Sequence, residues 1–218
     1  AVRDLQSLMA DRPPGSAQRR LAATNLPLAL GYIKLAEGAL QPALAEASAA
    51  RAAIEPIKVP ATDAGATRWK NQNLADSFNV ATRAAMQLGH YAQAETLARQ
   101  WLAIIPNATA TQTDPKPLES RARFILAQAI AMQGRRDEAR ATLQPAMAWY
   151  RQEQQAGATG TSFRHDYAYA LYVDSLIAPA GAAGSKQRDA DLDQAASLLA
   201  GATPEAQRLS AMRHISGL

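Results

Sequence analysis

Residues 86–106 read MQLGHYAQAETLARQWLAIIP, in which a glycine separates two apolar runs and a proline closes the second. If Gly89 ends one helix, the next helix extends from about Tyr91 to Ile105. Its apolar residues recur every three or four positions, which is the period of a helix that buries one face; they are Leu97, Trp101, Leu102 and Ile105. Proline disfavours helix at the preceding residue, so Pro106 is predicted to end this helix.

The same spacing occurs around two other glycines, Gly38 and Gly134. Each of the three glycines has a small residue seven positions before it and an alanine five positions after it. The small residues are Gly31, Thr82 and Ala127, and the alanines are Ala43, Ala94 and Ala139. A glycine supplies the left-handed conformation that ends a helix. The small residue and the alanine let the two helices of a hairpin pack closely, so the pattern predicts three helix hairpins.

This recurrence resembles the tetratricopeptide repeat, a helix–turn–helix unit with a loop glycine and a closing proline. The matching residues are Leu30, Gly31, Gly38 and Ala43, then Phe78, Gly89, Tyr91, Ala94 and Pro106, then Leu126, Ala127, Gly134, Ala139 and Leu143. The resemblance covers about residues 17–151. The glycines lie 51 and 45 residues apart, whereas the family repeat has about 34, so the connections are expected to be enlarged.

Composition agrees with a helical protein. Hydrophobic residues make up 48% of the 218 positions, aromatic residues only 6%, and alanine, the best helix former, is abundant. The net charge is +4, and the arginines are scattered among acids, which disfavours nucleic-acid binding. The absence of cysteine excludes disulfides and thiolate metal sites. No apolar run approaches the roughly 20 residues of a membrane span.

Stretches rich in Pro, Gly, Ser or Thr divide the chain; they are 11–16, 59–67, 107–117, 156–162 and 179–185. The expected fold is all-α, a single right-handed α-solenoid of about four antiparallel hairpins over 1–218. The expected repeats are 17–56, 72–106, 119–151 and 163–201, followed by a closing helix at 204–218. Ser162 is a candidate N-cap for the helix that begins at 163. Pro27 and Pro145 fall inside predicted helices, where proline kinks or breaks a helix.

No motif supports catalysis, a cofactor or a metal. Asp189, Asp191 and Asp193 alternate as in a calcium loop, but that loop needs a glycine at its sixth position and a glutamate at its twelfth. The chain has Gln194 and Ala200 there, so these acids are interpreted as a helix start. We therefore expect a non-enzymatic protein without cofactors. The aromatic group of Phe163, Tyr167, Tyr169 and Tyr172 is interpreted mainly as core, with a groove lining as the alternative.

The resemblance implies that the first helix of each hairpin lines a concave surface that binds a partner. By register, the partner-binding residues are Asn25 and Tyr32, then Asp76, Asn79 and Arg83, then Arg121, Phe124 and Gln128; Tyr167 is added as a possible stacking group. Relatives that bind chaperone C-terminal carboxylates use a clamp of Lys, Asn and Arg. The corresponding positions here include Leu28, Tyr32, Val80 and Ile125, so this partner class is not expected.

The expected function is therefore a protein-interaction or scaffolding module that binds a peptide or partner domain in a concave groove. The alternative is a regulatory or sensor region of a larger bacterial signalling protein, such as a transcription regulator or kinase. It rests on the first residues, AVRDLQ, which lack an initiator methionine. The compartment stays open between cytoplasm and periplasm.

The fold prediction is tested by circular dichroism. The far-ultraviolet spectrum is expected to show a dominant helical signal with no sheet component. A sheet of three or more strands would end the solenoid interpretation.

Overall fold

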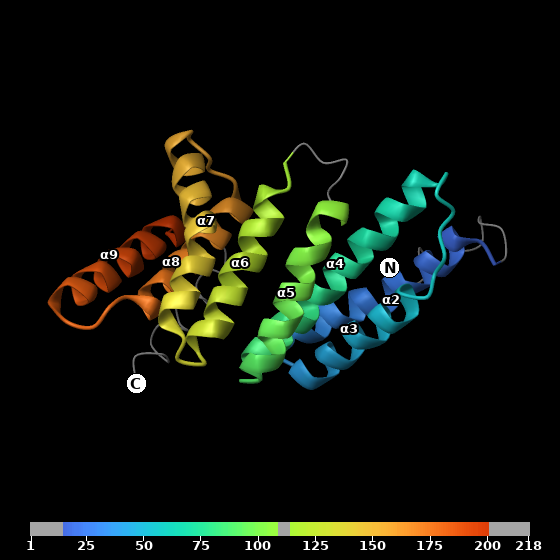
Figure 1. Cartoon of the computed structure of the whole chain (residues 1–218), viewed down its shortest axis with the longest axis horizontal. Helices are drawn as coiled ribbons and strands as arrows, with labels where there is room; N and C mark the ends of the chain where they lie inside the picture. The colour runs from blue at the N-terminus through green and yellow to red at the C-terminus, as the bar shows by residue number, and fades with distance from the viewer. Residues whose placement is uncertain (1–14, 109–113, 201–218) are drawn as a thin grey trace. The chain divides into compact units, whose positions relative to one another are not determined.

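A computed structural model describes residues 15–108 and 114–200, and these residues form eight α-helices and no β-strand (Figure 1). The helices are α2 (Ala17–Ala36), α3 (Leu40–Ile54), α4 (Ala64–Gln87), α5 (Tyr91–Ala108), α6 (Lys116–Ala131), α7 (Arg136–Gln155), α8 (Thr161–Ile177) and α9 (Ala182–Leu199). The all-α prediction is confirmed for this part of the chain. The closing helix expected at 204–218 lies outside the described residues.

The chain divides into two compact units, Ala1–Pro115 and Lys116–Leu218. In unit 1, α2 packs against α3, α4 packs against both of them, and α5 packs against α4. In unit 2, α6 packs against α7, α8 packs against both, and α9 packs against α8. Both units therefore use the same order of packing, in which the third helix contacts both helices of the first pair.

Glycines follow the ends of α2, α4 and α6, as the three recurring glycines predict. Gly89 has φ +75°, its N–H donates to the carbonyl of Met86, and the N–H of His90 donates to the carbonyl of Ala85. This pair of bonds is the Schellman motif, which satisfies carbonyls that the helix end leaves free. Gly38 and Gly134 repeat it, with φ +75° and +82°. The left-handed conformation predicted for all three glycines is confirmed.

The small residues of the repeat lie where the helices approach closely. A Cβ atom added to Gly31 would be 3.2 Å from Val80 Cγ1 on α4 and 3.7 Å from the carbonyl oxygen of Ala43 on α3. Gly31 thus lies against Ala43, the alanine five positions after Gly38 in the recurring pattern. The equivalent residues of the other two hairpins are fully buried; they are Thr82, Ala94, Ala127 and Ala139.

The core of each unit consists of side chains from the facing stripes of these helices. In unit 1, Leu21, Leu28, Ala50, Ile54, Ile57 and Ala66 form one buried cluster, and Trp101 and Ile105 of α5 are buried as the periodicity predicts. In unit 2 the largest fully buried side chains are Ile130, Leu143, Met147, Tyr150, Tyr167, Leu171 and Ile177. Burial of this apolar surface is the main stabilising contribution to the packing.

Several helix starts differ from the predicted ones. The second hairpin was expected from 72, but α4 begins at Ala64 because the Asp63 carboxylate accepts a hydrogen bond from the N–H of Ala66 at 2.8 Å. Gly65 therefore lies in the first helical turn, not in a loop. Helix α8 begins at Thr161 with Gly160 as its N-cap, so the prediction of Ser162 as N-cap is wrong. Helix α9 begins at Ala182, within the predicted break.

One of the prolines, Pro106, behaves differently from the prediction. Pro106 was expected to end α5, but the helix continues to Ala108. The side chains of Ile105 and Ala108 are buried on either side of it, and this burial favours the helical conformation over the local preference of proline. Helices α2 and α7 run through Pro27 and Pro145, so neither proline breaks its helix.

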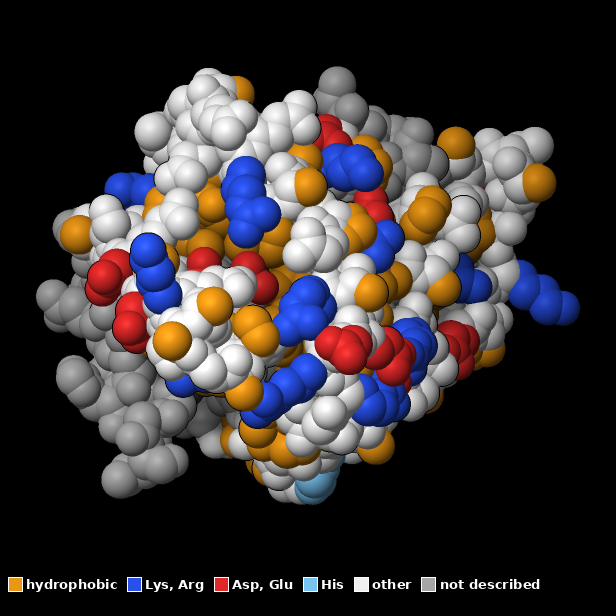
Figure 2. All heavy atoms as spheres, turned by 60° about the vertical axis from the view of Figure 1, so that its left-hand side comes forward, with side chains coloured by type: hydrophobic (Ala, Val, Ile, Leu, Met, Phe, Trp, Pro, Cys, Tyr) orange, Lys and Arg blue, Asp and Glu red, His pale blue; other side chains and the backbone are white. Residues whose placement is uncertain are grey.

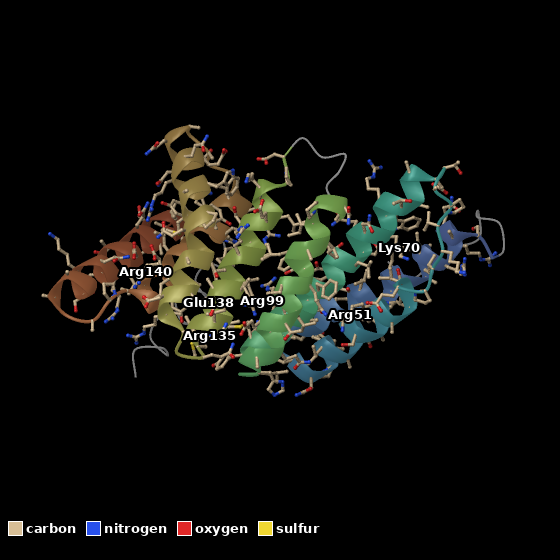
Figure 3. All side chains as sticks on the ribbon, viewed as in Figure 1. Arg51, Lys70, Arg99, Arg135, Glu138 and Arg140 are labelled. Atoms are coloured by element: carbon tan, nitrogen blue, oxygen red, sulfur yellow. The ribbon has the colours of Figure 1, made fainter. Side chains whose placement is uncertain are left out.

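Basic side chains from neighbouring helices cover two helix ends. Lys70 of α4 donates from Nζ to the carbonyls of Glu55 and Ile57, at 2.9 and 2.7 Å, just beyond the end of α3 (Figure 3). Arg140 of α7 donates from Nη2 to the carbonyl of Ile177, the last residue of α8, at 2.7 Å. A cation at the carboxyl end of a helix interacts favourably with its dipole and with the free carbonyls.

Gly89→Val is expected to lower the free energy of unfolding more than Gly65→Val. An L-residue in the left-handed region costs about 1–2 kcal/mol, and a β-branched side chain raises the strain. A Cβ atom at Gly65, which has no positive φ, would meet only Asp63 Oδ1 at 3.6 Å. Urea unfolding of the two variants measures the difference, and equal midpoints would contradict the helix end assigned to Gly89.

Lys70→Met is expected to destabilise the protein by about 1 kcal/mol, because it removes two hydrogen bonds while keeping the apolar stem of the side chain. Lys58→Met, at an exposed position in the connection between α3 and α4, is the control and is expected to leave stability unchanged. Thermal unfolding followed by circular dichroism compares them. A Lys70 variant as stable as the Lys58 control would show that the ammonium group contributes nothing to holding the end of α3.

Candidate functional site

The residues predicted to bind a partner lie in two separate units. Asn25 and Tyr32 are on α2, and Asp76, Asn79 and Arg83 are on α4, all in unit 1. Arg121, Phe124 and Gln128 are on α6 and Tyr167 is on α8, in unit 2. Each group is described by itself below, as an α2–α4 cluster and an α6–α8 cluster.

The α2–α4 cluster consists of Asn25, Tyr32, Asn73, Asp76 and Asn79. The hydroxyl of Tyr32 donates to Asp76 Oδ1 at 3.3 Å and accepts a hydrogen bond from Asn79 Nδ2 at 3.2 Å. Three of the residues that the sequence predicted to bind a partner are thus hydrogen-bonded to one another across the contact between α2 and α4. Asp76 also accepts from Gln72 Nε2 at 3.4 Å.

Asn73 is the member of this cluster that the sequence interpretation missed. Its side chain is buried, and its Nδ2 atom donates to Thr24 Oγ1 and to Asn25 Oδ1, each at 3.0 Å. Asn73 precedes Asp76 by three positions, so the two share one face of α4. That spacing is the signal in the sequence that could have identified it.

Burial and charge fix the protonation state of the Tyr32 hydroxyl. Burial, followed by the negative charge of Asp76, raises the pKa of Tyr32 to about 12. A phenol with the ordinary pKa of about 10 is already protonated at neutral pH, and the raised pKa keeps Tyr32 a donor to Asp76 at higher pH as well. Arg83 follows Asn79 by four positions on α4 and is exposed, and its positive charge lowers the pKa of Tyr32. Asn79 is buried, so it contributes to helix packing more than to the surface.

The α6–α8 cluster consists of Arg121, Phe124, Gln128, Asp166 and Tyr169. Arg121 donates from Nε to both carboxylate oxygens of Asp166, at 3.2 and 3.1 Å, and from Nη2 to Asp166 Oδ2. Charge-assisted bonds of this forked kind are among the stronger hydrogen bonds in proteins. Asp166 lies 45 positions from Arg121 in the sequence, whereas Glu119, only two positions away, has other partners.

Glu119 is instead the partner of Arg123 and Lys116. Arg123 donates from Nη2 to Glu119 Oε1 at 2.8 Å, and Lys116 Nζ lies 3.6 Å from Glu119 Oε2. Hydrogen bonding to Arg123 and the nearby positive charges outweigh burial and lower the pKa of Glu119. This acid is four positions from Arg123 on the same helix, a spacing that brings side chains together.

Aromatic and amide side chains complete the α6–α8 cluster. The rings of Phe124 and Tyr169 have centroids 5.2 Å apart, and the Tyr169 hydroxyl donates to Gln128 Oε1 at 3.0 Å. Phe124 is buried, whereas Gln128 and Tyr169 are half-buried. The half-buried groups therefore form the part of the cluster that solvent reaches.

Tyr167 does not contribute surface. It is 1% exposed, its ring stacks on that of Tyr150 of α7 at 5.3 Å, and its hydroxyl accepts from Gln194 Nε2 of α9 at 3.2 Å. Tyr167 therefore has the core role that the sequence analysis favoured for the aromatic group, because its ring contacts α7 and its hydroxyl contacts α9.

The three alternating aspartates of the sequence lie within one helix. Helix α9 begins at Ala182 with no acid in its first turn, and Asp189, Asp191 and Asp193 lie in its middle, so the interpretation of these acids as a helix start is wrong. Within residues 15–108 and 114–200, no three His, Cys, Asp or Glu side chains gather as metal ligands, and no helix has the length and apolarity of a membrane span. On the face in Figure 2, basic and acidic side chains are interspersed.

Comparison with models of known protein families, with curated protein sequences and with solved structures finds no match.

Proposed function

We propose that this protein is an interaction module that binds a peptide or partner domain along the first helices of its hairpins. The observation that supports it is the order of packing in each unit, where α4 contacts both α2 and α3, and α8 contacts both α6 and α7. That order places the first helices of successive hairpins beside each other. In the proposed arrangement the hairpins are antiparallel and stack as tetratricopeptide-like repeats within a right-handed solenoid.

The composition of the two clusters supports a polar, extended partner. Both lie between neighbouring first helices and consist largely of hydrogen-bonding side chains. The α6–α8 cluster includes Arg121, and Arg83 follows Asn79 of the α2–α4 cluster by four positions on α4. Half-buried groups such as Asn25 and Gln128 keep part of their polar surface exposed to solvent. A peptide lying across the helices would find donors and acceptors on groups whose positions are already fixed by contacts such as Tyr32–Asp76. Side chains held in place lose less conformational entropy on binding.

The two arginines differ in what they offer a partner. Arg121 already donates to both oxygens of Asp166, so an incoming carboxylate would have to compete with that pair. Arg83 is exposed at the end of the α2–α4 cluster. We therefore assign recognition of an acidic side chain to Arg83 and a structural role to Arg121.

Arg83→Glu is expected to weaken binding of an acidic partner about fivefold or more, because it replaces an ion pair of up to roughly 1 kcal/mol by a repulsion. Binding should also become less dependent on salt, while the melting temperature stays unchanged. A partner identified by affinity capture and then purified, or its peptide, is titrated against the wild type and the variant. Arg136→Glu, at an exposed position in unit 2, is the control.

Arg121→Glu separates binding from stability in the same experiment. It sets a carboxylate against Asp166, so the melting temperature of this variant is expected to fall whether or not the partner contacts unit 2. Unchanged affinity of the Arg83 variant would place the binding surface away from the α2–α4 cluster.

A further inference from the structure

Helix α9 packs against α8 (Figure 1) through both apolar and polar groups. Its buried residues are Gly184, Asp191 and Ala195, and Leu192, Leu198 and Leu199 are half-buried. One of the buried side chains is therefore a carboxylate, and its charge affects how firmly α9 packs.

Two carboxylates are buried in that contact. Asp174 of α8 is 4% exposed and Asp191 of α9 is 9% exposed. Asp191 Oδ2 is buried without a hydrogen-bond partner among the described residues. A hydrogen bond from Gln187 favours the charged form of Asp191, but burial and the second carboxylate act in the opposite direction and outweigh it.

The charged and titratable groups around the two acids come from three helices. Arg151 of α7 acts on both acids and Arg140 of α7 on Asp174, while Tyr167 of α8 lies beside Asp191. Arg188 of α9 donates from Nε to the carbonyl of Ser175, next to Asp174, at 3.4 Å. Arg151 Nη2 lies 3.7 Å from Asp174 Oδ2, and half of the arginine side chain is exposed. Arg140 is also bonded to Asp137 and to the carbonyl of Ile177. Arg151 is thus the one arginine that acts on both acids, and solvent screens it.

We propose that α9 is an acid-stabilised helix, in which proton uptake by Asp191 tightens its packing against α8 and proton loss loosens it. When Asp191 and Asp174 are both charged, their repulsion and the unpartnered oxygen act against the contact. When Asp191 is neutral, its carboxyl group no longer repels Asp174 and can donate a hydrogen bond. Loosening of α9 would uncover the face of α8 that carries Tyr167 and Asp174.

The direction of the pH effect follows from the pKa of the folded state. Burial, followed by the charge of Asp174, raises the pKa of Asp191 to about 6, above the value of about 3.9 in an unfolded chain. Burial also raises the pKa of Asp174. The stabilisation is therefore complete below the unfolded pKa and is lost as pH rises through about 6.

Amide hydrogen exchange of the full chain at pH 5 and pH 7.5 tests the proposal. After correction for the intrinsic pH dependence of exchange, protection of α9 is expected to be about tenfold higher at pH 5, since one unit of pKa shift corresponds to a factor of ten. Asp191→Asn, which keeps the shape of the side chain, is expected to give equal protection at both pH values. Asp193→Asn, at an exposed position in the same helix, should keep the wild-type ratio.

Two results would overturn the proposal: equal protection of wild-type α9 at both pH values, or a wild-type ratio retained by Asp191→Asn. If Asp191→Asn fails to fold, Asp174→Asn decides, because removal of that charge must raise the protection of α9 at pH 7.5. Histidine also changes charge in this range, so His165→Gln is included and is expected to keep the wild-type ratio.

Discussion

Each unit depends on one packing arrangement, in which its third helix lies against both helices of the preceding pair. A single pair of packed helices leaves much of its apolar surface in water, and α4 covers that surface for α2 and α3 as α8 does for α6 and α7. The contact requires α2 and α4 to approach closely. At Gly31 the helices leave no room for a side chain, since a Cβ atom there would be 3.2 Å from Val80 Cγ1. The residues that join the first helices, and therefore both clusters, are positioned by this contact.

The sequence predicted helix content and hairpin turns well because these depend on local chemistry. The three glycines end helices in the conformation that their spacing indicated, and the small residues seven positions before them are buried. Helix starts were predicted less well. The Asp63 cap, the Gly160 start and the continuation through Pro106 depend on side chains or burial that compete with local preference. The composition of a loop does not indicate whether a cap, burial or local preference determines where the neighbouring helix begins or ends.

For the candidate site, register along each helix was predictable and partners across helices were not. The spacing placed Tyr32, Asp76 and Asn79 on facing sides of first helices, and they are in contact. It did not indicate that Asp166 would bind Arg121, since the two lie 45 positions apart and their pairing depends on how α8 rotates against α6. It also did not exclude Tyr167 as a surface group, because a tyrosine stacked in a core and one lining a groove have the same helical period.

The order in which helices pack also bears on how the chain folds during synthesis. Within each unit, contacts join helices that are neighbours or next neighbours along the chain, and proteins with such short-range contacts fold quickly. The pair α2 and α3 gains its close-fitting partner at Gly31 only when residues up to Val80 have left the ribosome. A nascent chain that stops short of α4 would therefore expose the apolar face of α2 and α3 that α4 covers in the folded unit. The length of chain between α3 and Val80 determines how long that face stays exposed during synthesis.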